Sequence, residues 1–403
     1  MIMQSTPPLH RPDSVHRKAG RADTKRRNLR TILRLIASGG TTTRAEVARI
    51  TGLTRATVSS LVSDLIADGL VAEAGQGPSL GGKPPTLIEL NRSGRHLVVA
   101  DLSTSPFTGT VVDLSGRSVR APLAGPAEST HQGNLEQLLA TLIDESPHPI
   151  SGVGLASPGV ISEDGVVIEA SNLGWHNHPL AELTERAVEL PVTVINDAQA
   201  IAVAAYDRLA GGPAAGIDAV PDLLLIHLGR GIGAGIILGG RIHVGSHRAA
   251  GEIGHSVVDL AGPECRCGNR GCLETVASSA AIYHTIVGRR PASIDWNITK
   301  LEDRYGADTV AAAIAEAGEA VATVVGFLIN ALDISLTAIA MRPGDAAKPM
   351  AAAVARSLTN RVLPALRPDL QVMPVEGEDL AMVGAGAILL QQEYGLPWAA
   401  PAD

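Results

Sequence analysis

Every cysteine of the chain lies within one run of eight residues, CRCGNRGC. The run supplies Cys265, Cys267 and Cys272, and His255 lies ten positions before the first of them. Three thiolates and one neutral imidazole select Zn²⁺ in tetrahedral geometry, and the glycines of the run let the chain fold tightly around an ion. Because four protein ligands leave no open position for water, the sequence predicts a structural zinc site without a catalytic role.

The cysteine count excludes a disulfide framework. Three is an odd number, and a bridge between Cys265 and Cys267 would be strained. Three reduced thiols without a ligand role are the alternative to a metal site. The N-terminus is polar and basic, and we find no apolar run of about 18 residues, so neither secretion nor a membrane span is expected. A reducing, cytoplasmic setting fits these features best.

The charge of the chain is divided unevenly. Residues 1–95 hold 15 Lys and Arg against 7 Asp and Glu, whereas the remainder holds 18 against 34. A basic head on an acidic body indicates a nucleic-acid-binding module, although a solvated basic tail would give the same balance. Residues 1–24 are rich in Pro, Arg, His and Ser without periodicity, and we expect a disordered basic tail there.

Residues 25–92 carry the pattern of a winged helix-turn-helix domain. Apolar residues at helical spacing predict a first helix. Thr43 and Glu46 form a capping-box pattern that begins a second helix, whose apolar side holds Val47 and Ile50. A short turn then leads into a third helix, and two short strands around a Gly/Pro-rich loop follow as a wing.

The third helix is expected to enter the major groove of DNA. A helix N-terminus offers backbone N–H groups to phosphate, and arginine and hydroxyl side chains can reach base edges. A lysine in the wing can touch the DNA backbone or the minor groove. The predicted DNA-binding residues are Arg44, Arg55, Thr57, Ser59, Ser60 and Lys83. A small three-helix protein-interaction domain is the alternative.

Residues 96–403 alternate apolar strand patterns with helical ones, as in an α/β fold. A strand predicted at residues 192–197 ends in Asn196 and Asp197, and a helix follows at once. Open α/β sheets bind ligands at the carboxyl ends of their strands, so these polar side chains mark a candidate site. The last part, from about residue 301 to 392, is predicted to be mostly helical, with one strand at residues 336–341.

Several motifs together resemble the ROK family of repressors, open reading frames and sugar kinases. They are IND, GRGIGAG, AAGEIGHSVVD and CRCGNRGCLE in the body, and GGKPP in the wing, which is similar to the repressor branch. The resemblance covers nearly the whole chain from about residue 25. It implies an α/β protein in which a winged helix-turn-helix precedes a two-lobed, actin-like ATPase fold with a ligand in the cleft. It also implies a homodimer or homotetramer, and zinc on the matching His and three Cys.

The resemblance further implies a sugar site beside the metal. Glu252 lies three residues before His255, and Glu274 lies two after Cys272, so a metal would hold both acids near one place. Carboxylates and amides bind sugar hydroxyls in pairs. The residues at the family's sugar-contacting positions are Asn196, Asp197, Glu252, His255 and Glu274, and Asn172 lies in a further matching stretch. Surface acids without a ligand are the alternative.

Three departures from the kinase branch point away from ATP. Kinases carry Asp-x-Gly-Gly-Thr after the first strand, whereas this chain reads DLSTSPFTG from Asp101, with side chains that obstruct a phosphate. Arg230 stands where kinases carry a small hydroxyl residue, and Arg342 stands where they have Gly-Gly. In a kinase Asp197 would be the general base, but phosphoryl transfer also needs the phosphate cradle. The glycines kept at residues 229–235 are then expected to be tight turns.

We therefore expect a sugar-responsive DNA-binding transcriptional regulator, a repressor of carbohydrate genes and not an enzyme. Its partners would be a double-stranded DNA operator and a sugar or sugar-phosphate effector, and its metal a structural zinc. Two alternatives stay open. One is a sugar kinase fused to a DNA-binding head, and the other is a regulator controlled by a protein partner instead of a sugar.

Overall fold

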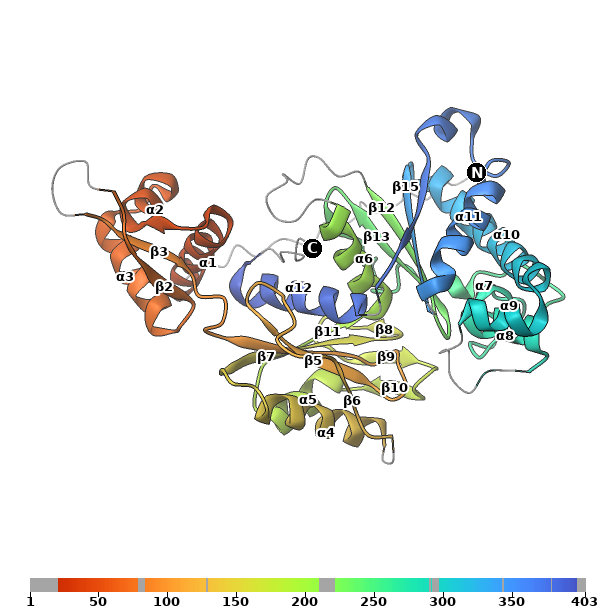
Figure 1. Cartoon of the computed structure of the whole chain (residues 1–403), viewed down its shortest axis with the longest axis horizontal. Helices are drawn as coiled ribbons and strands as arrows, with labels where there is room; N and C mark the ends of the chain where they lie inside the picture. The colour runs from red at the N-terminus through yellow and green to blue at the C-terminus, as the bar shows by residue number, and fades with distance from the viewer. Residues whose placement is uncertain are drawn as a thin grey trace, which may run out of the picture.

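The computed structural model describes residues 21–78, 84–127, 130–209, 222–289, 291, 297–342, 344–377 and 379–396, which form a small head and a body of two α/β lobes (Figure 1). The predicted tail lies largely outside the described residues, as does the wing residue Lys83. Helix α1 begins at Arg21, before the predicted domain boundary at residue 25.

The head is a winged helix-turn-helix. Its three helices bury one apolar side each, and the strands form a sheet of order β1-β3-β2. Strands β2 and β3 pair antiparallel and flank the predicted wing. The elements are α1 (Arg21–Gly39), β1 (Thr42–Thr43), α2 (Arg44–Thr51), α3 (Arg55–Ala67), β2 (Val71–Gln76) and β3 (Thr86–Leu90).

Both helices of the helix-turn-helix begin at a threonine cap. Thr43 Oγ1 accepts the Glu46 N–H and Thr54 Oγ1 accepts the Thr57 N–H, each at 3.2 Å. Two expectations for α2 were wrong. Ile50 is 51% exposed and does not join the apolar side, and the Glu46 carboxylate pairs with an arginine of its own helix instead of closing the capping box.

The first lobe is built on a five-stranded sheet of order β11-β7-β4-β5-β6. Its parallel strands β4 and β7 are almost wholly buried, which explains the apolar residues at their centres. Helices α4 and α5 cover one face, and α12 covers the other (Figure 1). The elements are β4 (His96–Asp101), β5 (Thr108–Asp113), β6 (Leu123–Ala124), α4 (His131–Asp144), β7 (Ile150–Ser157), β8 (Val160–Ile161), β9 (Val167–Ala170), β10 (Trp175–His178), α5 (Leu180–Val188) and β11 (Val192–Asn196).

The second lobe is built on a sheet of order β14-β13-β12-β15-β16. Alternate residues of its central strand β12 enter different cores, because helices cover both faces of the sheet. Strand β16 was not predicted in the C-terminal part. The elements are α6 (Asp197–Leu209), β12 (Leu223–Leu228), β13 (Ile232–Leu238), β14 (Arg241–Ile242), η2 (Ile253–His255), α7 (Leu273–Ala277), α8 (Ser279–Val287), α9 (Ile298–Tyr305), α10 (Ala307–Leu332), β15 (Leu336–Met341), η3 (Gly344–Ala346), α11 (Ala347–Leu358), η4 (Pro364–Asp369), β16 (Gln371–Val375) and α12 (Leu380–Tyr394).

Helices α6 and α12 pack on each other between the two sheets and share one buried core with both. The glycines of β13 permit this close packing: a Cβ at Gly235 would lie 2.3 Å from Ala202 Cβ, and one at Gly233 would lie 3.0 Å from Ala198 Cβ. Neither glycine has a positive φ. The expectation of tight turns was therefore wrong for Gly233 and Gly235, which serve helix packing, whereas Gly229 and Gly231 do lie in the tight turn between β12 and β13.

The head is joined to the body by α12 as well as by the chain itself. Buried residues of the head and of the first lobe belong to one apolar cluster, which includes Leu33 of α1 and Leu390 of α12. Arg34 Nε donates to Gly395 O at 3.0 Å, and the Arg30 guanidinium donates to Gln392 O. The C-terminal end of α12 therefore holds α1 (Figure 1).

By its length and composition, helix α10 could cross a membrane. The expectation that the chain holds no apolar run of about 18 residues did not foresee this helix. More than half of its most apolar stretch is buried in the second lobe, where it packs along α11. A buried core helix of a folded domain has the same composition. The packing explains the apolar sequence without a membrane.

Candidate functional site

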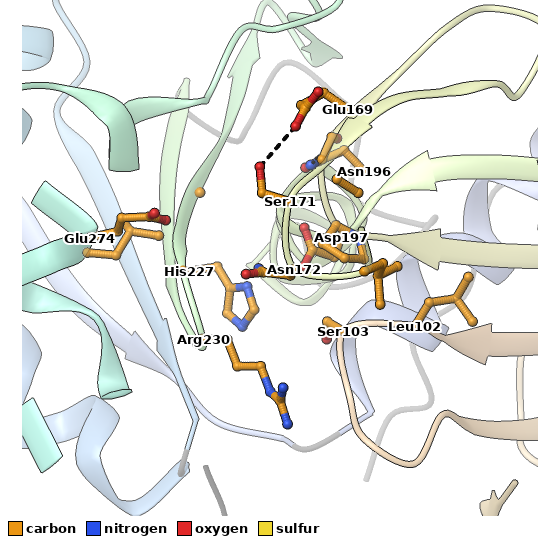
Figure 2. Close-up of a pocket in the computed structure, with 18 of the residues that line it drawn as sticks. Leu102, Ser103, Glu169, Ser171, Asn172, Asn196, Asp197, His227, Arg230 and Glu274 are labelled. Carbon is orange, nitrogen blue, oxygen red and sulfur yellow. Dashed lines mark hydrogen bonds between the residues drawn. The ribbon is translucent and has the colours of Figure 1, made fainter. Parts of the chain in front are cut away.

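The two lobes enclose a cavity of ≈ 410 Å³ at the carboxyl ends of β4, β11 and β12. Figure 2 shows Ser103 and Asp197 on one side of the cavity, facing His227, Arg230 and Glu274 on the other. The six residues predicted to contact a sugar all line this cavity: Asn172, Asn196, Asp197, Glu252, His255 and Glu274. The structure thus brings together residues from four separate segments, and their contacts with a ligand stay a prediction.

Asn196 and Asp197 lie where β11 ends and α6 begins. Asn196 Oδ1 accepts the Gln199 N–H at 3.0 Å, and its Nδ2 donates to Gly159 O at 3.0 Å. The Asn196 amide is therefore occupied by the start of α6 and by the first lobe. Asp197 Oδ1 accepts the Ala198 N–H at 2.8 Å, which leaves Asp197 Oδ2 as the oxygen available to a ligand.

Glu252 and His255 are held by a short 3-10 turn that lies directly on β13. A Cβ at Gly251 would be 2.0 Å from Ala234 O, and one at Gly254 would be 2.2 Å from Ile232 O. Only glycine permits such contact between backbones. The two glycines of the motif AAGEIGH therefore fix the depth at which Glu252 and His255 enter the cavity.

Glu274 and Asn172 approach each other from opposite lobes. Both Glu274 Oε2 and Asn172 Nδ2 lie beside Gly231, at 2.9 Å and 3.7 Å from the position of a Cβ on that residue. The Asn172 Oδ1 accepts a hydrogen bond from the guanidinium of Arg266. Arg266 sits between two cysteines of the run, and sequence reasoning had not assigned it a role.

Burial and neighbouring carboxylates raise the pKa values of Asp197 and Glu252. Burial, and after it the neighbouring Asp101, raise the pKa of Asp197 to about 6. Burial, and then Asp197 and Glu274, raise the pKa of Glu252 to about 7. Like charges crowded into a buried space disfavour the charged forms. This end of the cavity therefore suits a neutral ligand that donates several hydrogen bonds.

The four predicted metal ligands form one cluster beside the cavity. The ligand atoms of His255, Cys265, Cys267 and Cys272 all lie within 4.8 Å of one another. Cys267 Sγ lies 3.7 Å from Cys272 Sγ, and His255 Nδ1 lies 3.7 Å from Cys265 Sγ. A tetrahedral zinc with bonds of about 2.3 Å to sulfur has edges of about 3.8 Å, so the donor set and its spacing fit Zn²⁺.

The metal cluster is linked to the cavity through its own ligands. His255 turns Nδ1 toward the cysteines, while its Nε2 lies 3.9 Å from Glu252 Oε2. Cys265 Sγ donates to Glu274 Oε1 at 3.1 Å. The predicted closeness of both acids to the metal ligands is therefore present, and an ion held here would fix the positions of both carboxylates.

The part of the cleft where the kinase branch is expected to hold ATP is occupied here by the protein's own side chains. Arg342 Nη2 donates to Asp101 Oδ2 at 2.7 Å, and Asp101 Oδ1 accepts the Ser103 N–H and hydroxyl. Burial, and then Arg342, lower the pKa of His227 to about 4, so this imidazole is neutral. The sequence had identified Arg342 as foreign to kinases, but not its partner in the other lobe.

The predicted DNA-binding residues differ in their exposure and in whether their side chains are already paired. Arg55, Ser59 and Ser60 are exposed along α3. The Thr57 hydroxyl pairs with Thr54 Oγ1 at 2.8 Å, and Arg44 lies 3.3 Å from the Glu73 carboxylate of β2. The exposed N-terminal half of α3 is therefore the most accessible part of the head for base contacts.

Comparison with known proteins identifies the body and the head. The ROK family profile matches residues 100–392. The chain belongs to the ROK family. The MarR family profile matches residues 23–77, which cover the helices of the head. The resemblance drawn from the cysteine and glycine motifs is thereby confirmed, as is the fold class of a winged helix-turn-helix before an actin-like ROK body.

Relatives with this arrangement are regulators. The xylose repressor of Bacillus subtilis is 30% identical over 268 residues, which are 65% of this chain and 68% of the repressor. The DNA-binding transcriptional dual regulator NagC of Escherichia coli is 27% identical over 381 residues, which are 91% of this chain and 92% of NagC.

Solved structures show the same division. A ROK family transcriptional regulator, a homologue of the Escherichia coli MLC protein, has a TM-score of 0.74 at 25% identity and covers 92% of this chain and 97% of its own. A ROK family glucokinase from Streptomyces griseus, in complex with glucose and AMPPNP, has a TM-score of 0.59 at 25% identity. It covers 73% of this chain and 98% of its own, so the kinase matches less of the chain than the regulator does.

Proposed function

We propose that the cleft binds a sugar and thereby controls how the head binds an operator, in a protein that is a DNA-binding transcriptional regulator of the ROK family. The observation that carries the proposal is one cavity, lined by Asp197, Glu252 and Glu274, in a body that also carries a winged helix-turn-helix head. Relatives named as xylose and N-acetylglucosamine repressors support a repressor of carbohydrate genes. The effector is a sugar or a sugar phosphate.

The sugar is held at the acidic end of the cavity. Asp197, Glu252 and Glu274 accept hydrogen bonds from sugar hydroxyls, and His255 Nε2 completes this side. The Asn172 amide, whose oxygen is taken by Arg266, offers its Nδ2 as a donor. Asn196 supports the site by fixing the start of α6.

Zinc on His255, Cys265, Cys267 and Cys272 supports the sugar site. Bound zinc supplies a structural cross-link between η2 and the start of α7, with no part in a reaction. Glu252 lies in the same short segment as one ligand, and Glu274 follows another by two residues. The chain's own ligands therefore orient both acids toward the cavity.

A nucleotide has no prepared place in this cleft. Asp101 is paired with Arg342, and Ser103 and Thr104 fill the loop where kinases carry glycines. Phosphoryl transfer depends on a phosphate cradle and a metal ion, and the Asp101 carboxylate is already neutralised. These contacts support a regulator without kinase activity, in which Asp197 binds the sugar and does not act as a base.

A continuous path of packed helices leads from the cavity to the head. Asp197 is the first residue of α6, and α6 packs along α12. The end of α12 holds α1 through Arg30, Arg34 and the shared apolar cluster. A sugar that shifts α6 would be felt by the head through this packing, and a two-state response of α12 is the physical requirement.

A homodimer, or a tetramer of two such dimers, would present two heads to DNA. Two copies of α3 would then enter successive major grooves of a roughly palindromic operator in the cytoplasm. The sugar would change the spacing of the heads and hence operator affinity. The direct test is operator binding during titration with sugars: a shift supports the proposal, and indifference to every sugar and sugar phosphate overturns it.

Arg55→Ala is expected to weaken operator binding by about 1–3 kcal/mol while affecting non-specific DNA much less. Arg55 is exposed at the N-terminus of α3, where a guanidinium can reach base edges. Fluorescence anisotropy with operator and scrambled duplexes measures both losses. Arg49→Ala, on the preceding helix and paired with Glu46, is the control. Equal losses on both duplexes for Arg55→Ala would exclude a base-reading role.

A further inference from the structure

One ion pair crosses the cleft between the lobes. Asp101 ends β4 of the first lobe, and Arg342 follows β15 of the second. Their side chains meet at 2.7 Å, with the Asp101 side chain 0% exposed and that of Arg342 23% exposed. Because the pair joins the sheets of the two lobes and Arg342 lines the cavity, its geometry depends on how closely the lobes approach.

Each partner also makes a hydrogen bond within its own lobe. Asp101 Oδ1 accepts the Ser103 N–H at 2.8 Å and the Ser103 hydroxyl at 2.7 Å. The Arg342 N–H donates to Leu228 O at 2.9 Å, which continues the pairing of β15 with β12. The pair therefore connects one sheet directly to the other.

A fully buried carboxylate stays ionised only where a positive charge or hydrogen bonds compensate its burial. In a nucleotide-binding cleft a carboxylate at such a place commonly faces the metal ion that accompanies the phosphates. Here the positive charge comes from a side chain of the opposite lobe. A guanidinium supplies a fixed charge and planar donors, and unlike a nucleotide it cannot dissociate.

Two further arginines of the second lobe reach the first lobe nearby. Arg248 Nε donates to Ile161 O at 2.9 Å, and the Arg266 guanidinium donates to Asn172 Oδ1. Neither of these contacts is an ion pair. Among these three bridges across the cleft, the one made by Arg342 alone neutralises a buried charge, so its loss carries the largest penalty.

We propose that Arg342 is a positioning residue that permanently replaces the metal–nucleotide bridge of a kinase cleft. Its guanidinium neutralises Asp101 and holds the lobes closed, so the sugar side is formed without ATP. The same charge lies close to Asp197, because Arg342 and Asp101 both act on the pKa of that carboxyl in opposite directions. The closure part stands on the geometry alone, whereas the effect on ligand affinity rests on the proposed sugar-binding function.

The test compares four variants of the full chain with zinc retained. Arg342→Met removes the charge at similar volume, and Arg342→Lys keeps it. Asp101→Asn/Arg342→Met removes both charges, so that no buried carboxylate is left unpaired if the single variant folds poorly. Arg120→Met is the matched control, because Arg120 pairs with Glu145 inside the first lobe. Circular dichroism verifies folding, and small-angle X-ray scattering of the sugar-free proteins reports lobe closure.

Arg342→Met and the double variant are expected to show a larger radius of gyration than the wild type. Arg342→Lys is expected to stay closer to the wild type than either, and Arg120→Met to match it. Wild-type scattering from both charge-removing variants would overturn the proposal. In calorimetric titration with D-xylose, N-acetylglucosamine and their phosphates, Arg342→Met is expected to lower the affinity about tenfold or more. A wild type that binds none of them refutes the sugar-binding function, while scattering still decides the role of Arg342.

Discussion

Removal of the metal is expected to abolish the sugar response while leaving operator binding in place. Cys267→Ser takes away one ligand at the exposed side of the cluster, and mild chelation removes the ion from the wild type. Glu252 and Glu274 then lose their fixed positions, because Glu252 lies in the segment of His255 and Glu274 follows Cys272 by two residues. Two charge-assisted hydrogen bonds of about 1.5–3 kcal/mol each predict a loss of sugar affinity of about 100-fold or more.

The head is expected to tolerate this loss because its helices have their own buried side chains and lie far along the chain from the cluster. Operator affinity is measured by fluorescence anisotropy, sugar affinity by calorimetry, and metal content by elemental analysis. Arg270→Ala, in the same loop but exposed and only loosely paired with Glu264, is the control that should keep the metal and both affinities. An equal fall of operator binding on metal loss would show that the ion holds the DNA-binding assembly together.

Asp197→Asn is expected to weaken sugar binding by about 10- to 150-fold at pH 7.5, because an ionised acceptor is exchanged for an amide. The wild type should also lose affinity as the pH falls through about 6, since the raised pKa of Asp197 makes this carboxyl neutral below that value. The variant has no such ionisation and should give a flatter pH profile.

Calorimetric measurements of sugar binding between about pH 5 and pH 8 test this effect, because this range brackets the ionisation of Asp197. Asp207→Asn is the matched control, because Asp207 lies on the same helix and burial also raises its pKa, to about 7, but it does not line the cavity. A sugar affinity for Asp197→Asn equal to that of the wild type, or the same pH profile in both, would exclude Asp197 as a sugar ligand.

Local signals in the sequence were enough to predict the cluster of His255 with three cysteines and the helix caps. His255 and the three cysteines are a typical set of zinc ligands, and their short spacing lets their donor atoms come together. Thr43 and Thr54 are caps for reasons confined to one turn of backbone. The resemblance to the ROK family predicted the cavity residues. No local pattern in the sequence could show that these residues, from four separate segments, lie together.

The features that the sequence did not provide depend on packing between distant segments. Ile50 fits an apolar helix side by spacing, yet it is exposed because the helix turns it away from the core. The glycines of β13 serve the approach of α6, which is visible only once the helix is placed. Arg342 was recognisable as unusual, but its partner Asp101 lies 241 residues away and in the other lobe.

A sugar in the cleft is expected to change operator affinity. Operator DNA selected by the protein from a random duplex library is titrated in fluorescence anisotropy with D-xylose, D-glucose, N-acetylglucosamine, their phosphates, and MgATP. One sugar or sugar phosphate is expected to shift operator affinity by about 5- to 150-fold, with no shift in Asp197→Asn and none from MgATP. Operator affinity that stays the same with every sugar and sugar phosphate, with the metal in place, would refute control of the head by a sugar in the cleft.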